Sequence, residues 1–166
     1  MILTAHMLTG GAIGRLVPQN PLLAFILGFL SHFILDAIPH SEYELKSLIR
    51  NKENHEAQDM VLGKNFARDI FVIGLDFFLG IFLCLVIFKN GVGIFDPSLS
   101  MLSGALGGAL PDALQFLYFK IRKEPFTTLQ KFHIRIQNNL GSKHWAGWTT
   151  QVGVIVITIL VSKIIK

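Results

Sequence analysis

The chain has 166 residues, of which 51% are hydrophobic and 16% are charged, and its mean hydropathy is +0.52. Soluble domains carry about 25% charged residues, so this composition excludes an ordinary soluble domain and indicates an integral membrane protein. The net charge of +4 does not indicate nucleic-acid binding, because an excess of Lys and Arg in a membrane protein follows from the positive-inside rule.

Five apolar segments predict one all-α transmembrane domain over residues 1–166. The first segment is short for a span, and a signal peptide is the alternative, but the basic residues that begin such a peptide are missing. A turn rich in Gly, Asn and Pro, 89–97, separates the third segment from the fourth. The single cysteine, Cys84, lies in the third segment and predicts a small buried side chain. The predicted spans are 2–17, 21–38, 70–88, 99–119 and 148–165, with polar loops at 39–68 and 120–147.

A histidine and aspartate motif ends the second segment. His32, Asp36 and His40 are spaced by four residues, which places them on one face of a helix. An ionisable side chain in an apolar helix is costly in lipid, so this motif predicts a functional site that faces protein or water. His32 and His40 are roughly 12 Å apart along a helix axis, too far to share one metal ion. Pro39 disturbs the helix, however, and lets His40 leave that face.

The distribution of basic residues predicts the orientation of the spans. The N-terminus and the two polar loops share one side, which carries eleven of the fifteen Lys and Arg residues. The positive-inside rule places this side in the cytoplasm and the C-terminus outside. The ionisable residues of the spans then fall in one cytoplasmic half, a shared depth that favours a site over scattered structural roles. These residues are His6, His32, Asp36, Asp76 and Asp112.

Two segments of the chain resemble one another and predict an internal repeat. Residues 28–38 align without gaps with residues 104–114, and the two segments share Gly, Leu, Asp and Ala at four positions. Upstream, His6-x-x-x-Gly10 corresponds to Asp76-x-x-x-Gly80. We therefore predict two helical hairpins followed by a C-terminal span.

His and Asp without cysteine are the ligands expected for zinc, or for manganese or iron in a mixed nitrogen and oxygen site. The six predicted ligands are more than one tetrahedral ion needs. Two ions bridged by Asp36 or Asp112 would use them, and such pairs are typical of phosphoester hydrolysis. His40 and His144 are predicted as general acid or base groups. The Asn54-His55-Glu56 cluster predicts a solvated loop. The predicted metal ligands are His6, His32, Asp36, Asp76, Asp112 and His133.

The same motifs resemble a known family. Thr4-Ala5-His6, Ser31-His32-x-x-x-Asp36 and the Pro-Asp dipeptide that ends at Asp112 are similar to motifs of the bacterial membrane-bound metal-dependent hydrolases. These proteins are themselves similar to zinc-dependent phospholipase C. The resemblance covers most of residues 1–145 and implies a helical hydrolase of the bacterial inner membrane. The chain departs from the family's Pro-Asp-x-Asp pattern at Leu114. The matching metal-site positions are His6, His32, Asp36 and Asp112.

We therefore expect hydrolysis of a phosphoester in a membrane lipid or another amphiphile, and no nucleic-acid partner. Lys131, Arg135 and Lys143 flank the candidate histidines and are expected to bind a phosphate group. Proton-coupled transport is the main alternative, because intramembrane Asp and His also form proton relays. A non-catalytic membrane protein is another. The apolar last span offers a surface for a homodimer.

Overall fold

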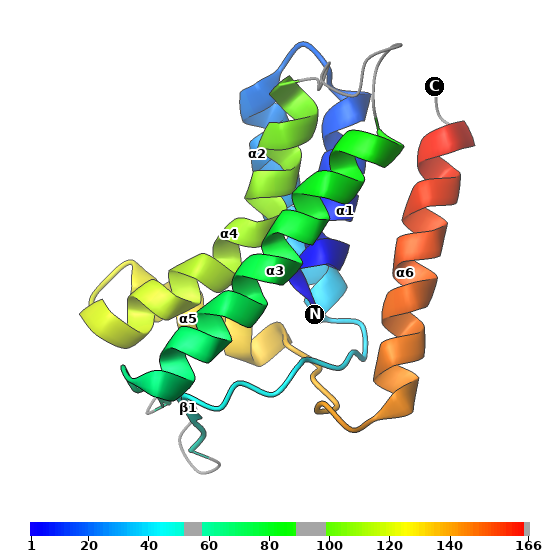
Figure 1. Ribbon diagram of the computed structural model, residues 1–166. Helices are drawn as coiled ribbons and strands as arrows, with labels where there is room; N and C mark the ends of the chain where they lie inside the picture. The colour runs from blue at the N-terminus through cyan, green and yellow to red at the C-terminus, as the bar shows by residue number, and fades with distance from the viewer. Residues whose placement is uncertain (52–57, 89–98, 165–166) are drawn as a thin grey trace.

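The computed structural model describes residues 1–51, 58–88 and 99–164, and within them the chain is helical apart from one short hairpin (Figure 1). The hairpin pairs β1 (Leu48–Ile49) with β2 (Asp59–Met60) in antiparallel fashion. The helices are α1 (Leu3–Leu16), α2 (Pro21–Asp36), α3 (Lys64–Ile87), α4 (Leu99–Ile121), α5 (Phe126–Ile136) and α6 (Trp145–Ile164).

The all-α prediction is confirmed, and a helix covers most of each predicted apolar segment. The helix of the third segment begins earlier than predicted, at Lys64, and that of the last begins at Trp145. Helix α5 and the β1–β2 hairpin lie in stretches that were predicted as polar loops. The Asn54-His55-Glu56 cluster and the predicted turn at 89–97 lie outside the described residues.

Helix α4 packs against both α1 and α2 through glycines. A Cβ atom added to Gly10 or to Gly28 would lie 2.2 Å from the carbonyl oxygen of Gly104, and one added to Gly14 would lie 2.2 Å from that of Ser100. The backbones of the three helices therefore approach more closely than any larger side chain allows. Gly10 and Gly14, spaced by four residues, therefore have the small-xxx-small pattern that allows close packing of helices.

Helices α1 to α4 alternate in direction, which gathers the polar segments at one end (Figure 1). Helices α1 and α3 run away from this end, and α2 and α4 return to it. The β1–β2 hairpin, α5, the N-terminus and the start of α6 all lie near it, whereas the C-terminal end of α6 lies at the other (Figure 1). The hydrophobic core between α1, α3 and α4 includes Met7, Leu8 and Met101, and Cys84 is buried in it as predicted.

Two of the described helices, α3 and α6, are long and apolar enough to cross a membrane. Little of either helix is buried. In the most apolar stretch of 18 residues, 11% of the residues are buried in α3 and 17% in α6. Phe71 and Phe78 of α3 are 66% and 69% exposed, and Ile157 of α6 is 62% exposed. Such faces are typical of a surface that meets lipid or another protein, and not of a soluble core. By contrast, α1 and α2, with 14 and 16 residues, are about 21 and 24 Å long, shorter than a hydrocarbon core of about 30 Å.

Candidate metal centre

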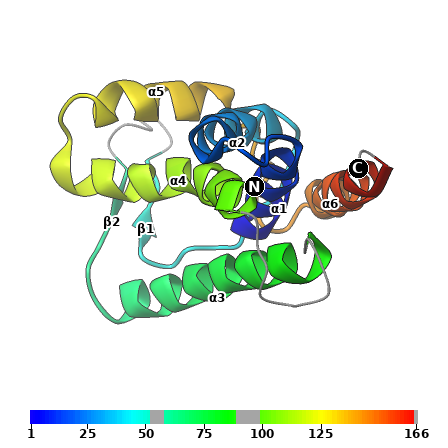
Figure 2. The ribbon, with the colours of Figure 1, turned by 90° about the horizontal axis from the view of Figure 1, so that it is seen from above.

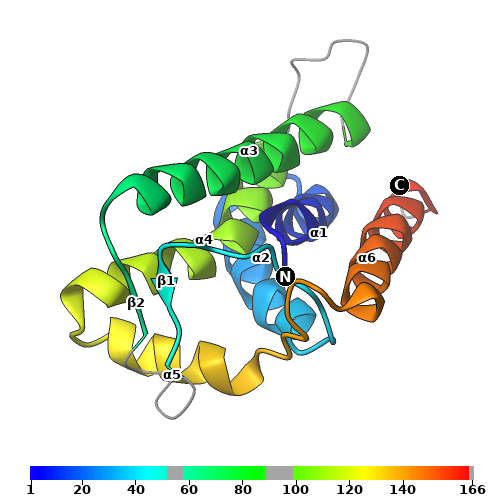
Figure 3. The ribbon, with the colours of Figure 1, turned by 60° about the horizontal axis from the view of Figure 1, so that its bottom comes forward.

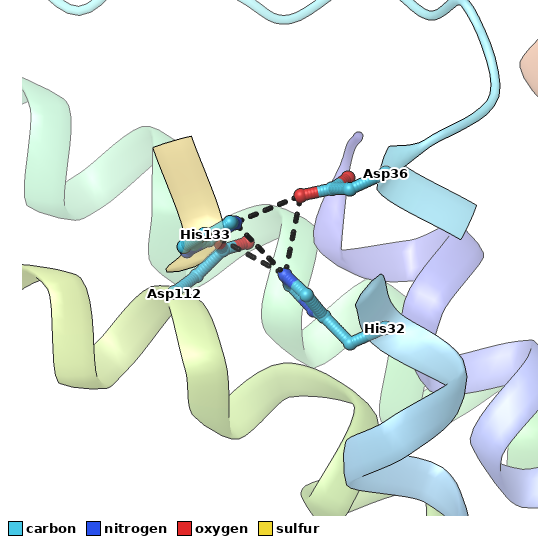
Figure 4. Close-up of side chains that lie close together, drawn as sticks. All are labelled: His32, Asp36, Asp112 and His133. Atoms are coloured by element: carbon cyan, nitrogen blue, oxygen red, sulfur yellow. Dashed lines mark hydrogen bonds and ion pairs between the residues drawn. The ribbon is translucent and has the colours of Figure 1, made fainter. Parts of the chain in front are cut away.

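A cluster of two histidines and two aspartates, of which only Asp112 is partly exposed, lies where α2, α4 and α5 meet (Figure 4). Helix α2 supplies two of its members and ends at the second of them, because Pro39 follows and the helix cannot continue through it. One ligand atom from each residue lies within 4.8 Å of those of the other three. The members are His32, Asp36, Asp112 and His133.

Asp36 is the centre of this arrangement. Its Oδ2 lies 2.9 Å from Nε2 of His133 and 3.3 Å from Nε2 of His32. The two histidine nitrogens are 3.3 Å apart. Asp112 completes the group from α4, since its Oδ1 is 3.7 Å from Nε2 of His32 and 3.9 Å from Nε2 of His133. Four nitrogen and oxygen donors thus converge on one point.

The ring of His32 is oriented by α4. Its Nδ1 lies 2.8 Å from the carbonyl oxygen of Gly108. A carbonyl oxygen only accepts, so Nδ1 carries the proton, and in the neutral ring Nε2 turns a free lone pair toward Asp36. A backbone carbonyl that fixes the tautomer in this way is common behind metal-binding histidines.

His6 of α1 lies beside the cluster. Its ring stacks on that of His32 with centroids 3.8 Å apart and an angle of 17° between the planes. Neither ring nitrogen makes a hydrogen bond within the described part of the chain, although Nε2 is 3.2 Å from Oδ1 of Asp36. Buried polar atoms almost always have a hydrogen-bond partner. The Nε2 atom of His6, together with the nitrogen and oxygen donors of the cluster beside it, therefore fits a site for a divalent metal ion.

His40 returns to the cluster after the end of α2. Its Nδ1 lies 2.8 Å from the carbonyl oxygen of Ile38, and its Nε2 is 3.6 Å from Oδ1 of Asp36. Hydrogen bonds from the His40 amide to Asn138 and from the Leu140 amide to His40 hold this backbone. The predicted departure of His40 from the helix face is therefore confirmed, and it brings the side chain back toward Asp36.

Glu42 belongs to the same polar network, and the sequence analysis did not single it out. Its carboxylate accepts hydrogen bonds from Gln137 and Asn139, both at 2.5 Å, and lies 3.4 Å from Nε2 of His40. The amino nitrogen of Met1 lies between Glu42 and Asp36, at 3.3 and 2.6 Å. Burial disfavours the charged form of Glu42, but the hydrogen bond with His40, together with the positive charges of the Met1 amino group and of His40, holds the pKa of Glu42 below its usual range.

Asp76, a predicted ligand, is not a member of the cluster. Its carboxylate accepts hydrogen bonds from the backbone nitrogens of Leu3 at 2.7 Å and Thr4 at 3.2 Å, and from the Thr4 hydroxyl at 2.5 Å. These are among the first donors of α1, which has no side-chain cap of its own. Asp76 therefore caps α1 from α3 and positions the helix that carries His6.

His144, the second predicted acid or base group, is exposed at the start of α6. Its carbonyl oxygen accepts a hydrogen bond from the hydroxyl of Ser41 at 2.8 Å. Nearby, the side chain of Gln151 is buried and bonds the backbone of Ile2 at 2.9 Å and of Ser41 at 2.7 Å. These contacts attach α6 to the polar network. A catalytic role for the His144 ring stays a prediction.

An apolar cavity of about 550 Å³ adjoins the cluster between α3 and α4. Segment 42–48 runs between these helices (Figures 2 and 3), and its residues Glu42, Tyr43, Leu45 and Leu48 line the cavity. Asp112 also lines it, so one carboxylate faces both the cavity and the two histidines. Burial, together with the nearby carboxylates, raises the pKa of Tyr43, so its hydroxyl stays neutral.

Comparison of the chain with models of known protein families, with curated proteins and with solved structures finds no match. The resemblance to metal-dependent hydrolases therefore rests on the short motifs alone.

Proposed function

We propose that this protein is a membrane-embedded, metal-dependent hydrolase that cleaves a phosphoester of an amphiphilic substrate. The observation that carries the proposal is the double role of Asp112, which belongs to the cluster and also lines the apolar cavity. A substrate whose apolar part occupies the cavity would place its polar part at the cluster. Small-molecule sites have this composition, with an apolar pocket and a few convergent polar groups.

The four residues of the cluster would hold the ion, with Asp36 and Asp112 supplying oxygen and His32 and His133 supplying nitrogen. This donor set suits zinc, and also manganese or iron. A divalent ion would supply Lewis-acid chemistry, which lowers the pKa of water and stabilises charge on phosphoryl oxygens. His6, whose ring nitrogens make no hydrogen bond to any described residue, is the residue best placed for a second ion.

His40 is the candidate for proton transfer. The carbonyl oxygen of Ile38 fixes the proton of the ring on Nδ1, so Nε2 of the neutral ring can accept a proton. The carboxylates of Asp36 and Glu42 lie 3.6 and 3.4 Å from this nitrogen. Arg135 and Lys143 are exposed, and we retain them with Lys131 as candidates for binding a phosphate group.

We further propose five spans in a bacterial inner membrane, with the polar end in the cytoplasm, lipid around α3 and α6, and a homodimer through α6. The exposed apolar side chains of these two helices support contact with lipid. The basic residues of the polar segments support the orientation.

The enzymatic proposal is tested with the purified protein in detergent, loaded with zinc, manganese or iron. We expect release of phosphate or a phosphorylated head group from amphiphilic phosphoesters, loss of this activity with a chelator, and loss in His32→Ala. A Lys123→Ala variant, changed at an exposed residue outside the cluster, is the control. Metal-independent proton flux in proteoliposomes, without hydrolysis, would instead support the transport alternative.

A further inference from the structure

The cavity between α3 and α4 has one polar end. Of the described residues that line it, only four carry a polar side chain, and Asp112 and Glu42 belong to the polar network around the cluster. Most of the remaining lining is aliphatic or aromatic, including Phe77, Phe116 and Phe119. A cavity with this lining matches a ligand that has a long apolar part and a small polar head. The polar residues are Glu42, Tyr43, Asp112 and Gln115.

The cavity reaches the apolar side of the molecule. Ile70 of α3 and Leu106 of α4 line it and are also 43% and 45% exposed. Other apolar side chains of α3, including Leu75 and Phe78, are also exposed. A ligand that enters past Ile70 and Leu106 would therefore come from the surface that we assign to lipid.

The size of the cavity suits a single alkyl chain. A methylene group fills about the volume of one water molecule, roughly 30 Å³, so about 550 Å³ holds one chain of about 18 carbon atoms. Two chains of ordinary membrane lipids need about twice this volume. The cavity therefore matches a single chain.

We propose that this cavity binds the alkyl chain of a single-chain amphiphile, which enters laterally between α3 and α4 and places its head beside Asp112. The inference deepens the proposed function by naming the substrate class, and the chemistry of the head group rests on that function. Binding of the chain itself requires no metal ion.

Gly74 provides a way to fill the cavity without disturbing the fold. It lines the cavity from α3, and a Cβ atom added there meets nothing within 4 Å among the described residues. Leucine is also the better helix former, so Gly74→Leu is expected to keep α3 intact while occupying the space. Gly153 of α6 has equally open surroundings and lies outside the cavity, so Gly153→Leu is the matched control.

The test uses the metal-free full chain in phosphatidylcholine vesicles and a hexadecanol probe that carries a photoreactive diazirine in its chain. We expect labelling of Phe77 and Phe116, with at least a fivefold decrease in Gly74→Leu and no change in Gly153→Leu. Labelling of the exposed α6 residues Val161 and Ile164, at least two helical turns from Gly153, provides an internal reference that neither variant changes. A two-chain lipid with the same photoreactive group is expected to label only the reference residues.

Equal labelling of Phe77 and Phe116 in the wild type and in Gly74→Leu would overturn the inference, as would strong labelling of these residues by the two-chain lipid. Metal content, measured on the same preparations, distinguishes a failure of the chain site from a failure of the proposed function. Cavity labelling in a protein that binds no metal supports the chain site and contradicts the hydrolase. Metal binding without cavity labelling contradicts the chain site alone.

Discussion

Asp36 combines more functional contacts than any other residue of the cluster. Its two oxygens face His6, His32, His40 and His133, and the Met1 amino nitrogen lies 2.6 Å from one of them. A buried carboxylate is stable only when its charge is compensated, and here that compensation comes from the polar network. The same residue thus holds the polar end of the fold together and supplies the central oxygen donor for a metal ion.

Asp76 is expected to affect stability and not metal binding. Asp76→Ala removes the hydrogen bonds to Leu3 and Thr4, and the loss of a helix cap costs about 0.5–2 kcal/mol. We expect a lower melting temperature in detergent with unchanged metal content. Asp76→Asn keeps one acceptor oxygen, so its melting temperature should lie between those of the wild type and of Asp76→Ala. Loss of metal in both variants, with folding intact, would show that Asp76 is a ligand.

Glu42 is expected to stabilise the fold in a pH-dependent way. Its pKa in the folded chain is below the ordinary value of 4.5, so its contribution is fully present above that pH and is lost as the pH falls toward the folded-state value. Glu42→Gln replaces the charged acceptor by a neutral one and weakens its hydrogen bonds. We expect the free energy of unfolding to fall by about 1–3 kcal/mol near neutral pH. The difference in melting temperature between wild type and variant should shrink as the pH falls below 4.5.

Glu44, two residues further along, is exposed, and Glu44→Gln is the matched control, with a small effect at every pH. A stability difference for Glu42→Gln that stays constant from neutral to acidic pH would contradict the role assigned to the charge of Glu42.

At the scale of the element, α4 determines how closely the helices pack. A Cβ atom on Gly104 would lie 2.1 Å from the carbonyl oxygen of Gly10, so Gly104→Ala forces α1 and α4 apart. Overpacking of this kind costs about 1–3 kcal/mol, and the cluster loses its geometry because α1 and α4 carry His6 and Asp112. We expect a lower melting temperature and weaker metal retention. Gly153→Ala, at an open helical position, should be neutral or stabilising by up to about 1 kcal/mol, and equal behaviour of the two variants would contradict this packing.

The helices of the apolar segments were predictable because hydropathy and Pro or Gly boundaries are local signals. Helix α5 was missed, although its buried residues Gln130 and His133 and its partly buried Phe126 and Ile136 follow a helical spacing, because its sequence is mostly polar. The β1–β2 hairpin has two residues in each strand, too few for an alternating pattern.

The members of the cluster were predictable for similar reasons. His32 and Asp36 share a helix face, and Asp112 corresponds to Asp36 in the predicted repeat. Gly28 and Gly104, which the same alignment pairs, lie against each other, an arrangement that two-fold related repeats produce. The environments of Glu42 and Asp76 depend on contacts between distant segments, which a single sequence does not encode locally.

At the scale of the whole molecule, the polar segments share one end, which the positive-inside rule places in the cytoplasm (Figure 1). The orientation can be tested with single cysteines in a Cys84→Ala background, using a maleimide that does not cross membranes. Lys46 and Gln19 are both exposed and lie at opposite ends of α2 in the predicted topology. We expect Gln19→Cys to react in intact cells and Lys46→Cys to react only after the cells are opened. Reaction of both in intact cells would contradict the orientation.

The central claim is that His32, Asp36, Asp112 and His133 bind a divalent metal ion, and elemental analysis of the purified protein tests it most directly. We predict one or two equivalents of zinc, manganese or iron after dialysis without chelator, and loss of this metal in Asp36→Ala and Asp112→Ala. Asp69→Asn changes a buried carboxylate that bonds Ser47 and Arg68 outside the cluster, and it should retain the metal. A wild-type protein that holds no metal and takes up none on reconstitution would contradict the claim.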